Sequence, residues 1–185
     1  MNLTEKQLAT EYIYEGRIIK LRRDTAELPD GKTAFREVVE HNGGVCVVPI
    51  TDDGKIILVE QYRYPYSEII AEIPAGKRDS AEEEPLLTGK RELKEEVGAS
   101  ADNFIFLGEL YPSPGYCGEI IWMYAATGLS FGDSCPDEDE FLNVKAYPLD
   151  DVVEKILSGE IKDAKTQAAV LKVKLLRDSG KLKKK

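Results

Sequence analysis

A loose alternation of apolar and polar residues predicts short strands through the first 40 residues. The segment YIYEGRIIKLRRDTAEL alternates, LPDGKTAF contains a Pro-Asp-Gly turn, and REVVEH has the pattern of another short strand. A three-stranded antiparallel piece of this size buries little apolar surface alone. We therefore expect it to pack on the main domain or on a partner subunit.

Stronger strand patterns follow. VCVVPI and KIILVEQY flank the turn sequence Thr51-Asp52-Asp53-Gly54, which predicts a β-hairpin. Further strands are expected at 68–74, 103–110, 119–127 and 141–147.

Three segments have helical patterns. The first spans 83–97, with Pro85 in its first turn and Gly98 at its end. The others are expected at 149–158 and 163–178. Mixed strands around a few helices predict an α/β fold, an α/β/α sandwich on a mixed β-sheet with a small N-terminal antiparallel β-piece. The expected regions are 1–42 for that piece, 43–179 for the main domain and 180–185 for a basic tail.

The charge balance narrows the classes of ligand. The formal net charge is −9, with a pI near 4.8, so the surface repels polyanions and general nucleic-acid binding is excluded as a function. A small phosphorylated ligand still fits if divalent cations lie between it and the acidic side chains.

Cysteine and histidine usage constrains compartment and chemistry. The three cysteines, Cys46, Cys117 and Cys135, form no CxxC pair, as expected for a reduced cytoplasmic protein. No apolar run approaches the roughly 20 residues needed to span a bilayer, and the N-terminal residues have no signal-peptide pattern, so no membrane association is expected. With His41 as the single histidine, acid–base work is expected from carboxylates, lysines or tyrosines.

The segment GKRDSAEEEPLLTGKRELKEEVGA, residues 76–99, carries the chemistry. On a helix Glu92 and Glu96 share a face, and Glu95 lies on its flank. Crowded carboxylates repel one another, but a hard divalent cation such as Mg²⁺ reverses that sign by binding carboxylate and phosphate oxygens together. A Glu-rich helix alone is more often only a solvated surface, so the surrounding residues decide between that interpretation and a metal site.

Those residues resemble the Nudix box: Gly, five residues, Glu, seven residues, then Arg-Glu-hydrophobic-x-Glu-Glu-x-Gly-hydrophobic. The matching positions here are Gly76, Glu83, Arg91, Glu92, Leu93, Glu95, Glu96, Gly98 and Ala99. Six residues rather than five separate Gly76 from Glu83. A loop absorbs such an insertion more easily than a helix does, which leaves the metal-binding helix intact.

The resemblance implies a Nudix-type fold in which the box forms a loop–helix–loop around metal ions. It implies that Glu92, Glu95, Glu96 and the backbone carbonyl of Ala75 bind Mg²⁺, with Mn²⁺ as a possible substitute. A second implied feature is an ion pair between Glu83 and Arg91 that braces the loop.

Segments before the box resemble the ADP-ribose pyrophosphatase branch of that family. These are Gln61-Tyr62-Arg63 and the stretch Glu72-Ile73-Pro74-Ala75-Gly76. The resemblance implies that Arg63 contacts the substrate, and a guanidinium suits phosphate oxygens. Glu72 is expected beside the metals and the substrate.

Segments after the box extend this resemblance. Pro114 lies 15 residues beyond Ala99, a position typical of ADP-ribose-cleaving members, and Glu119 is a candidate for binding a ribose hydroxyl. The acidic loop implies a catalytic base at Glu140, with Glu138 as second choice; Glu95 and Glu96 of the box remain alternatives. The start of the last helix, residues 161–166, is expected to be structural.

The N-terminal piece is expected to serve dimerisation and substrate contact. Tyr12, Tyr14 and Phe35 are candidates for stacking on adenine, but equally for core or interface positions. In the branch these strands often reach across a homodimer, so a homodimer is expected.

Together these observations predict Mg²⁺-dependent hydrolysis of the pyrophosphate of ADP-ribose, a nucleoside diphosphate sugar, to AMP and ribose 5-phosphate. One alternative is a Nudix hydrolase acting on GDP-mannose, NADH or a dinucleoside polyphosphate. Another is a catalytically silent nucleotide-binding module, and a third is a scaffold whose Glu-rich helix is only solvated surface.

Overall fold

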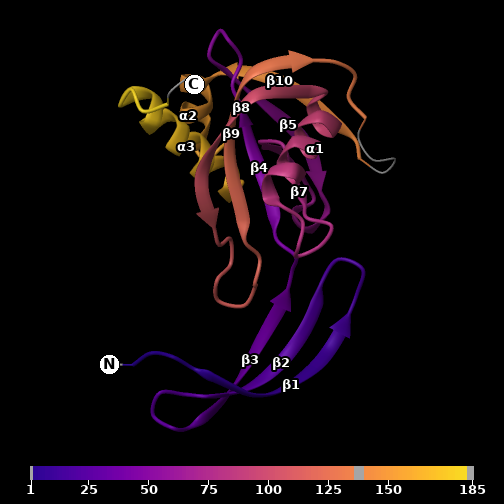
Figure 1. The fold of residues 1–185 in the computed structure, drawn as a ribbon, viewed down its shortest axis with the longest axis vertical. Helices are drawn as coiled ribbons and strands as arrows, with labels where there is room; N and C mark the ends of the chain where they lie inside the picture. Colours follow the sequence, from indigo (N-terminus) through magenta and orange to yellow (C-terminus); the bar gives the residue numbers. More distant parts are fainter. Residues whose placement is uncertain (1, 136–139, 183–185) are drawn as a thin grey trace.

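The computed structural model describes residues 2–135 and 140–182, whose strands form three sheets (Figure 1). The N-terminal sheet is antiparallel, in the order β1-β2-β3. Its strands are β1 Lys6–Glu15, β2 Lys20–Glu27 and β3 Thr33–Glu40.

Two further sheets form the main body. One is antiparallel, in the order β10-β5-β6; the other has the order β7-β4-β9-β8 and is mixed, because β4 and β9 run parallel. The strands are β4 Gly44–Pro49, β5 Lys55–Arg63, β6 Glu68–Glu72, β7 Ala75–Lys77, β8 Ala99–Leu110, β9 Ile121–Phe131 and β10 Leu142–Pro148. A short 3₁₀ turn, η1 Tyr64–Tyr66, joins β5 to β6.

Helices cover the sheets on both sides. They are α1 Pro85–Val97, α2 Leu149–Leu157 and α3 Ala164–Asp178. Helix α1 contacts β4, β7 and β8, whereas α3 contacts β4, β8 and β9, and α2 packs on α3, β5 and β10 (Figure 1). This arrangement confirms the predicted α/β/α sandwich. None of these helices is long and apolar enough to cross a membrane.

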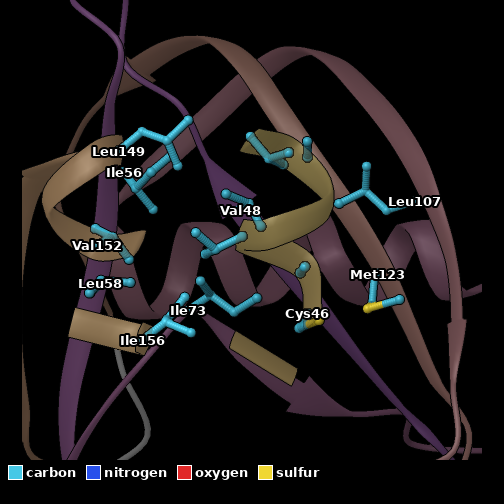
Figure 2. Close-up of a cluster of buried hydrophobic side chains, with 14 of the residues drawn as sticks. Cys46, Val48, Ile56, Leu58, Ile73, Leu107, Met123, Leu149, Val152 and Ile156 are labelled. Carbon is cyan, nitrogen blue, oxygen red and sulfur yellow. The ribbon is translucent and has the colours of Figure 1, made fainter. Parts of the chain in front are cut away.

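Strand β4 is buried along its whole length because apolar layers cover both of its faces. Cys46 and Val48 belong to the cluster beneath α2 and α3, which Figure 2 shows. Val47, which points the opposite way, belongs to the cluster under α1 with Leu93 and Val97. The continuous apolar run in the sequence therefore reflects a strand between two helical layers.

The predicted hairpin between β4 and β5 is wrong in its pairing, although its turn forms. The Gly54 amide donates to the Thr51 carbonyl at 2.9 Å, but only an isolated bridge between Ile50 and Ile56 links the strands. Both edges of β4 are occupied by β7 and β9, and both edges of β5 by β6 and β10. The two strands therefore enter different sheets.

The N-terminal sheet extends away from the main body (Figure 1). It is joined there by Val39, whose amide donates to the Tyr116 carbonyl at 2.8 Å and whose carbonyl accepts from Gly118 at 2.9 Å. Every residue of β1 is exposed, on both faces of the strand. The single chain thus leaves this sheet largely uncovered.

Candidate active site

Helix α1 presents two buried glutamates toward the strand before it. Glu92 and Glu96 are only 8% and 4% exposed, whereas Glu95 is half-buried on the flank of the same face. The helix begins at Pro85 and ends at Gly98, whose φ of 69° gives the left-handed cap that glycine favours. These signals fix where the carboxylates lie along the helix.

The start of β7 lies directly against these carboxylates. The amide of Ala75 donates to Oε2 of Glu96 at 3.1 Å. A Cβ added at Gly76 would lie 1.8 Å from Oε1 of Glu92, so the chain passes where only a glycine leaves room for that carboxylate.

The two buried carboxyls have pKa values far above the ordinary value. Burial raises the pKa of Glu92 to about 7, assisted by the charge of Glu95 and partly offset by Arg91. Burial raises the pKa of Glu96 to about 8, and the charge of Glu92 adds to the effect. Glu140 also raises both pKa values, so it lies close enough to repel both groups.

Arg91 holds two box carboxylates rather than the expected partner. Its Nη1 lies 2.8 Å from Oε1 of Glu92 and 2.9 Å from Oε2 of Glu95. Glu83 instead accepts a hydrogen bond from the Asp79 amide at 2.7 Å. Arg91 and Glu95 are one helical turn apart, whereas Glu83 precedes the helix and turns back on its own loop.

The loop with the inserted residue is braced by Arg78, which the sequence did not indicate. This buried guanidinium donates to the carbonyls of Glu83 at 2.8 Å and Asn42 at 3.1 Å, and also to that of Ala81. It also lies over the Trp122 ring, 4.7 Å from the centroid. The extra residue is thus accommodated by a loop tied to a fixed cation.

The donor set fits a hard divalent cation. Within 2–135 and 140–182, no three His, Cys, Asp or Glu side chains already form a metal-binding group. Arg91 bridges Glu92 and Glu95. Burial and mutual repulsion still raise the pKa values of Glu92 and Glu96 to about 7 and 8, because the charges of Arg91 and Arg63 offset these effects only in part. Buried carboxylate oxygens whose charge is only partly compensated are suitable ligands for Mg²⁺.

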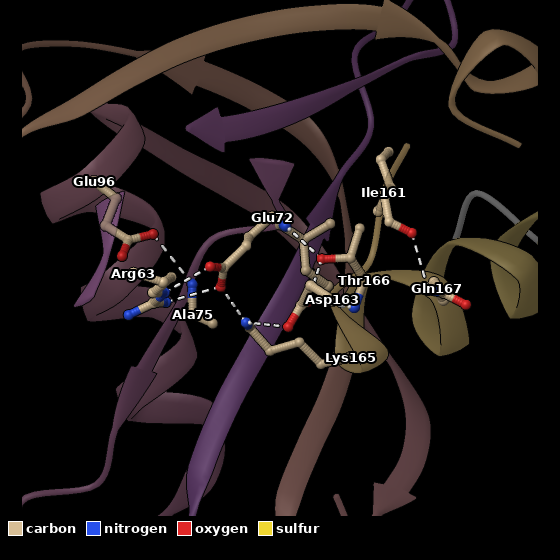
Figure 3. Close-up of polar contacts among 10 residues, drawn as sticks. Arg63, Glu72, Ala75, Glu96, Ile161, Asp163, Lys165, Thr166 and Gln167 are labelled. Carbon is tan, nitrogen blue, oxygen red and sulfur yellow. Dashed lines mark hydrogen bonds and ion pairs between the residues drawn. The ribbon is translucent and has the colours of Figure 1, made fainter. Parts of the chain in front are cut away.

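Glu72 lies on the other side of the Ile73–Ala75 segment from α1, and its carboxylate contacts two cations, Arg63 and Lys165 (Figure 3). Glu72 is 2% exposed. Arg63 holds it with Nε at 2.6 Å from Oε1 and Nη2 at 2.8 Å from Oε2, and Lys165 also reaches Oε2. Burial alone would raise the pKa of Glu72, but the Arg63 hydrogen bonds and the Lys165 charge lower it overall.

A cavity of about 330 Å³ is lined by Arg63 and Lys165, which hold Glu72, and by Ala75 and Gly76, which lie against the α1 carboxylates. Arg63, Ala75 and Glu119, predicted from the sequence, all line it, and Arg63 and Glu96 are close enough to shift each other's pKa. Pro112 is on the wall, whereas Pro114 is exposed on the same loop, so its role stays a prediction. The lining residues are His41, Gly44, Val45, Arg63, Ala75, Gly76, Lys77, Pro112, Glu119, Ile121, Asp163, Ala164 and Lys165.

His41 is a second wall residue that the sequence analysis did not select. Its Nδ1 accepts from the Gly43 amide at 3.0 Å and lies 3.6 Å from Oε1 of Glu119. His41 and Lys77 also line a second cavity of about 200 Å³ beneath the β1–β2 turn. His41 is a candidate functional residue because it lines both cavities, and this position cannot be inferred from the sequence.

The predicted aromatic contacts lie elsewhere. Tyr12, Tyr14 and Phe35 are exposed on the N-terminal sheet and line neither cavity of this chain. Tyr12 donates to Glu40, and Phe35 lies under the Arg23 guanidinium. Glu138, the second choice for the base, falls outside the described residues.

Two sequence profiles match the chain. The NUDIX domain profile matches residues 40–170, and that of the nucleoside diphosphate sugar hydrolase N-terminal domain matches residues 5–39. A methanol dehydrogenase activator of Bacillus methanolicus is 44% identical over 168 residues, 90% of each chain. An ADP-ribose pyrophosphatase of Bacillus subtilis is 43% identical over 171 residues, 91% of this chain and 92% of the relative.

A solved structure has the same architecture. It is described as an ADP compounds hydrolase and superposes with a TM-score of 0.84 at 25% identity, covering 98% of this chain and 100% of the other. The box glutamates on α1, the profile over residues 40–170 and this likeness agree, and the chain belongs to the Nudix family.

Proposed function

We propose that this Nudix protein hydrolyses the pyrophosphate of ADP-ribose, with Mg²⁺, to AMP and ribose 5-phosphate. The observation that carries the proposal is the pair of buried glutamates, Glu92 and Glu96, beside a cavity walled by Arg63. A high sequence identity to a protein named ADP-ribose pyrophosphatase supports this substrate.

Glu92, Glu95, Glu96 and the carbonyl of Ala75 would hold the metal, with Mn²⁺ as a possible substitute. When bound, Mg²⁺ supplies charge neutralisation of the phosphate oxygens and a lower pKa for water. The chain's own contribution would be a buried carboxylate face that holds the metal and an arginine at the cavity wall that binds a phosphate oxygen.

The reaction needs a base to accept the proton of the attacking water. Glu140 is our first assignment, because its charge acts on both Glu92 and Glu96. Glu95 and Glu96 remain the alternatives within the box. Because interacting carboxyls titrate together, mutagenesis rather than a pH profile alone distinguishes them.

The other wall residues suit the remainder of the substrate. Arg63 has Nε and Nη2 on Glu72, which leaves Nη1 outside that pair for a phosphate oxygen. Glu119 is suited to accept a ribose hydroxyl, and Pro114 to hold its loop in a fixed conformation.

We also propose that the protein acts as a homodimer in the cytoplasm. Exposed apolar side chains gather on the N-terminal sheet and its turn: Leu8, Tyr12, Ile13, Tyr14, Ile18 and Phe35. A second copy that covers this sheet would bury them. Free thiols at all three cysteines suit a reducing compartment. Sedimentation analysis tests the dimer, and a monomer at micromolar concentration would contradict it.

The substrate test is a panel of ADP-ribose, GDP-mannose, NADH and diadenosine polyphosphates, each incubated with Mg²⁺ or with EDTA and analysed by chromatography. We expect AMP from ADP-ribose well above the products from the others, and none with EDTA. Preference for another compound would keep the Nudix chemistry and reject the substrate. No turnover with Mg²⁺ or Mn²⁺ would favour a silent nucleotide-binding module.

The relative named methanol dehydrogenase activator favours a second candidate function, activation of a methanol dehydrogenase. If this chain also raises the rate of a methanol dehydrogenase, the Glu96→Gln variant tells whether hydrolysis is required. An equal effect of wild type and variant would indicate a binding function.

A further inference from the structure

Lys165 is a buried cation in the first turn of α3 that reaches the candidate active site from the C-terminal part of the chain. Its side chain is 12% exposed, lies between Glu72 and Asp163, and lines the cavity with Arg63 (Figure 3). Its Nζ is 3.0 Å from Oδ1 of Asp163 and also contacts Oε2 of Glu72. The four groups form a row of alternating charge that ends at Arg63.

The pKa values of Glu72, Lys165 and Arg63 are each shifted in the direction that favours the charged form. Burial alone would lower the pKa of Lys165, but the charges of Asp163 and Glu72 raise it overall. Hydrogen bonding to Glu72 likewise raises the pKa of Arg63 against the effect of burial. The row therefore carries two carboxylates and two cations, with a cation at the cavity end.

The anchoring of α3 to the rest of the site is carried by a different residue. Asp163 is the N-cap: its Oδ2 accepts from the amide of Thr166 at 2.8 Å and from its hydroxyl at 2.6 Å. The Thr166 hydroxyl in turn accepts from the Ile73 amide at 2.9 Å. Helix and loop are thus joined without Lys165, which leaves its ammonium to act on Glu72.

Among the described residues, Glu72 is the only hydrogen-bond partner of the Arg63 side chain, so the carboxylate determines where the guanidinium points. A carboxylate held only by Arg63 would follow that side chain, which is 39% exposed and free to turn into solvent. Because Lys165 also holds Glu72, this carboxylate is a fixed hydrogen-bond acceptor for Arg63.

We propose that Lys165 is a positioning residue for the substrate diphosphate: it fixes Glu72, and Glu72 orients Arg63 toward the cavity. The inference rests on the proposed function in taking a nucleoside diphosphate as the ligand. It assigns a role in substrate binding to a segment whose sequence indicated only a structural role.

The test compares Lys165→Met with Lys162→Met, a control that removes an equal charge three residues earlier. Lys162 is exposed and pairs with Glu68 at 2.7 Å, away from the cavity lining. For Lys165→Met we expect KM for ADP-ribose to rise about tenfold with kcat within about twofold, since a preset arginine stabilises ground and transition states alike. Lys162→Met should match wild type, and Lys165→Arg should recover most of the loss.

A double-mutant cycle distinguishes positioning from a direct contact. Adding Lys165→Met to Arg63→Met should change KM by less than about twofold, because the residue through which it acts is gone. A full tenfold effect in that background would overturn the proposal, as would a KM for Lys165→Met equal to that of the Lys162 control.

Calorimetric binding of ADP with Mg²⁺ separates this inference from the proposed function. If wild type releases no AMP from ADP-ribose, the substrate assignment fails, yet ADP affinity still has to fall about tenfold in Lys165→Met. Unchanged ADP affinity would overturn the positioning role. If Lys165→Met does not fold, Asp163→Asn, which keeps an N-cap, takes its place and should raise KM about threefold.

Discussion

Two buried glutamates lie on either side of the Ile73–Ala75 segment, and their pKa values move in opposite directions; we call these two sides the walls of the candidate site. Glu72, on the β6 side, is 2% exposed, and its pKa is lowered; Glu96, on α1, is 4% exposed, and its pKa is raised to about 8. The Ile73–Ala75 segment separates them, and it contacts α1 through the Ala75 amide (Figure 3).

The difference is one of partners and not of burial. Glu72 has Arg63 and Lys165 on its oxygens, whereas Glu96 has one backbone amide and the like charge of Glu92. One wall is neutralised by the protein itself and is complete as folded. The charges of the other are only partly offset by the protein, which is why we propose a metal ion from solution at that wall.

Of the substitutions that test this difference between the two walls, the one with the largest expected effect changes turnover. Glu96→Gln removes a metal-binding charge, and we expect AMP release to fall on the order of 10³-fold while the fold is retained. Glu154→Gln, on the exposed face of α2, is the matched control and should keep wild-type activity. Near-wild-type turnover of the Glu96 variant would contradict the metal-site assignment.

The pH dependence of stability in EDTA should distinguish the two walls by sign. Glu92 and Glu96 have folded pKa values of about 7 and 8, above the unfolded value of 4.5. Their contribution is fully present below pH 4.5 and is lost as pH rises through 7 to 8, by at most about 1.4 kcal/mol per pH unit for each group. Glu72, whose pKa is lowered, loses its contribution in the other direction, as pH falls below 4.5.

Thermal unfolding from pH 5 to pH 8 measures this. The midpoint in EDTA should fall over that range, Mg²⁺ should raise it more at pH 8 than at pH 5, and Glu96→Gln should flatten both trends. A midpoint that rises with pH in EDTA would show that the α1 carboxylates are neutralised without metal.

Glu72→Gln tests the self-neutralised wall. It leaves Arg63 and Lys165 without their shared counter-charge, so we expect a loss of about 2 kcal/mol, less than for a fully buried pair because Arg63 is partly exposed. The unfolding midpoint should drop by roughly 4–8 °C at every Mg²⁺ concentration. Glu96→Gln at pH 8 should instead raise the midpoint in EDTA, and equal signs for the two variants would refute the comparison.

The sequence predicted the shared face of Glu92 and Glu96 on α1 because its signals are local, whereas their role as metal ligands stays a prediction. Spacing on one helix defines the shared face of Glu92 and Glu96, and Pro85 and Gly98 mark the helix ends. The apolar patterns also located the strands of the sandwich except β7 Ala75–Lys77, where no strand was expected. They did not distinguish a hairpin from two strands that join separate sheets, because edge occupancy depends on the distant strands β7, β9 and β10.

The self-neutralised wall was only half predictable for the same reason. Arg63 and Glu72 were identified by resemblance, but Lys165 reaches Glu72 across 93 residues of chain, and no local pattern encodes that contact. Arg78 was missed because a cation in an irregular loop has no periodicity to interpret. Arg91 pairs with Glu95, one helical turn further along α1, and not with Glu83 as expected.

The smallest expected effect comes from a substitution at Gly76, whose backbone passes close to the carboxylate of Glu92. An alanine at Gly76 places its Cβ 1.8 Å from Oε1 and 1.9 Å from Cδ of Glu92, so that carboxylate has to swing away. Since the obstructed atoms end a side chain rather than belong to the backbone, the fold should persist, and the Mg²⁺ concentration for half-maximal AMP release should rise about tenfold. Gly132→Ala, where an added Cβ meets nothing within 4 Å, is the control. An unchanged Mg²⁺ requirement in Gly76→Ala would mean that Glu92 binds the metal from another rotamer, and that the approach of Gly76 serves packing alone.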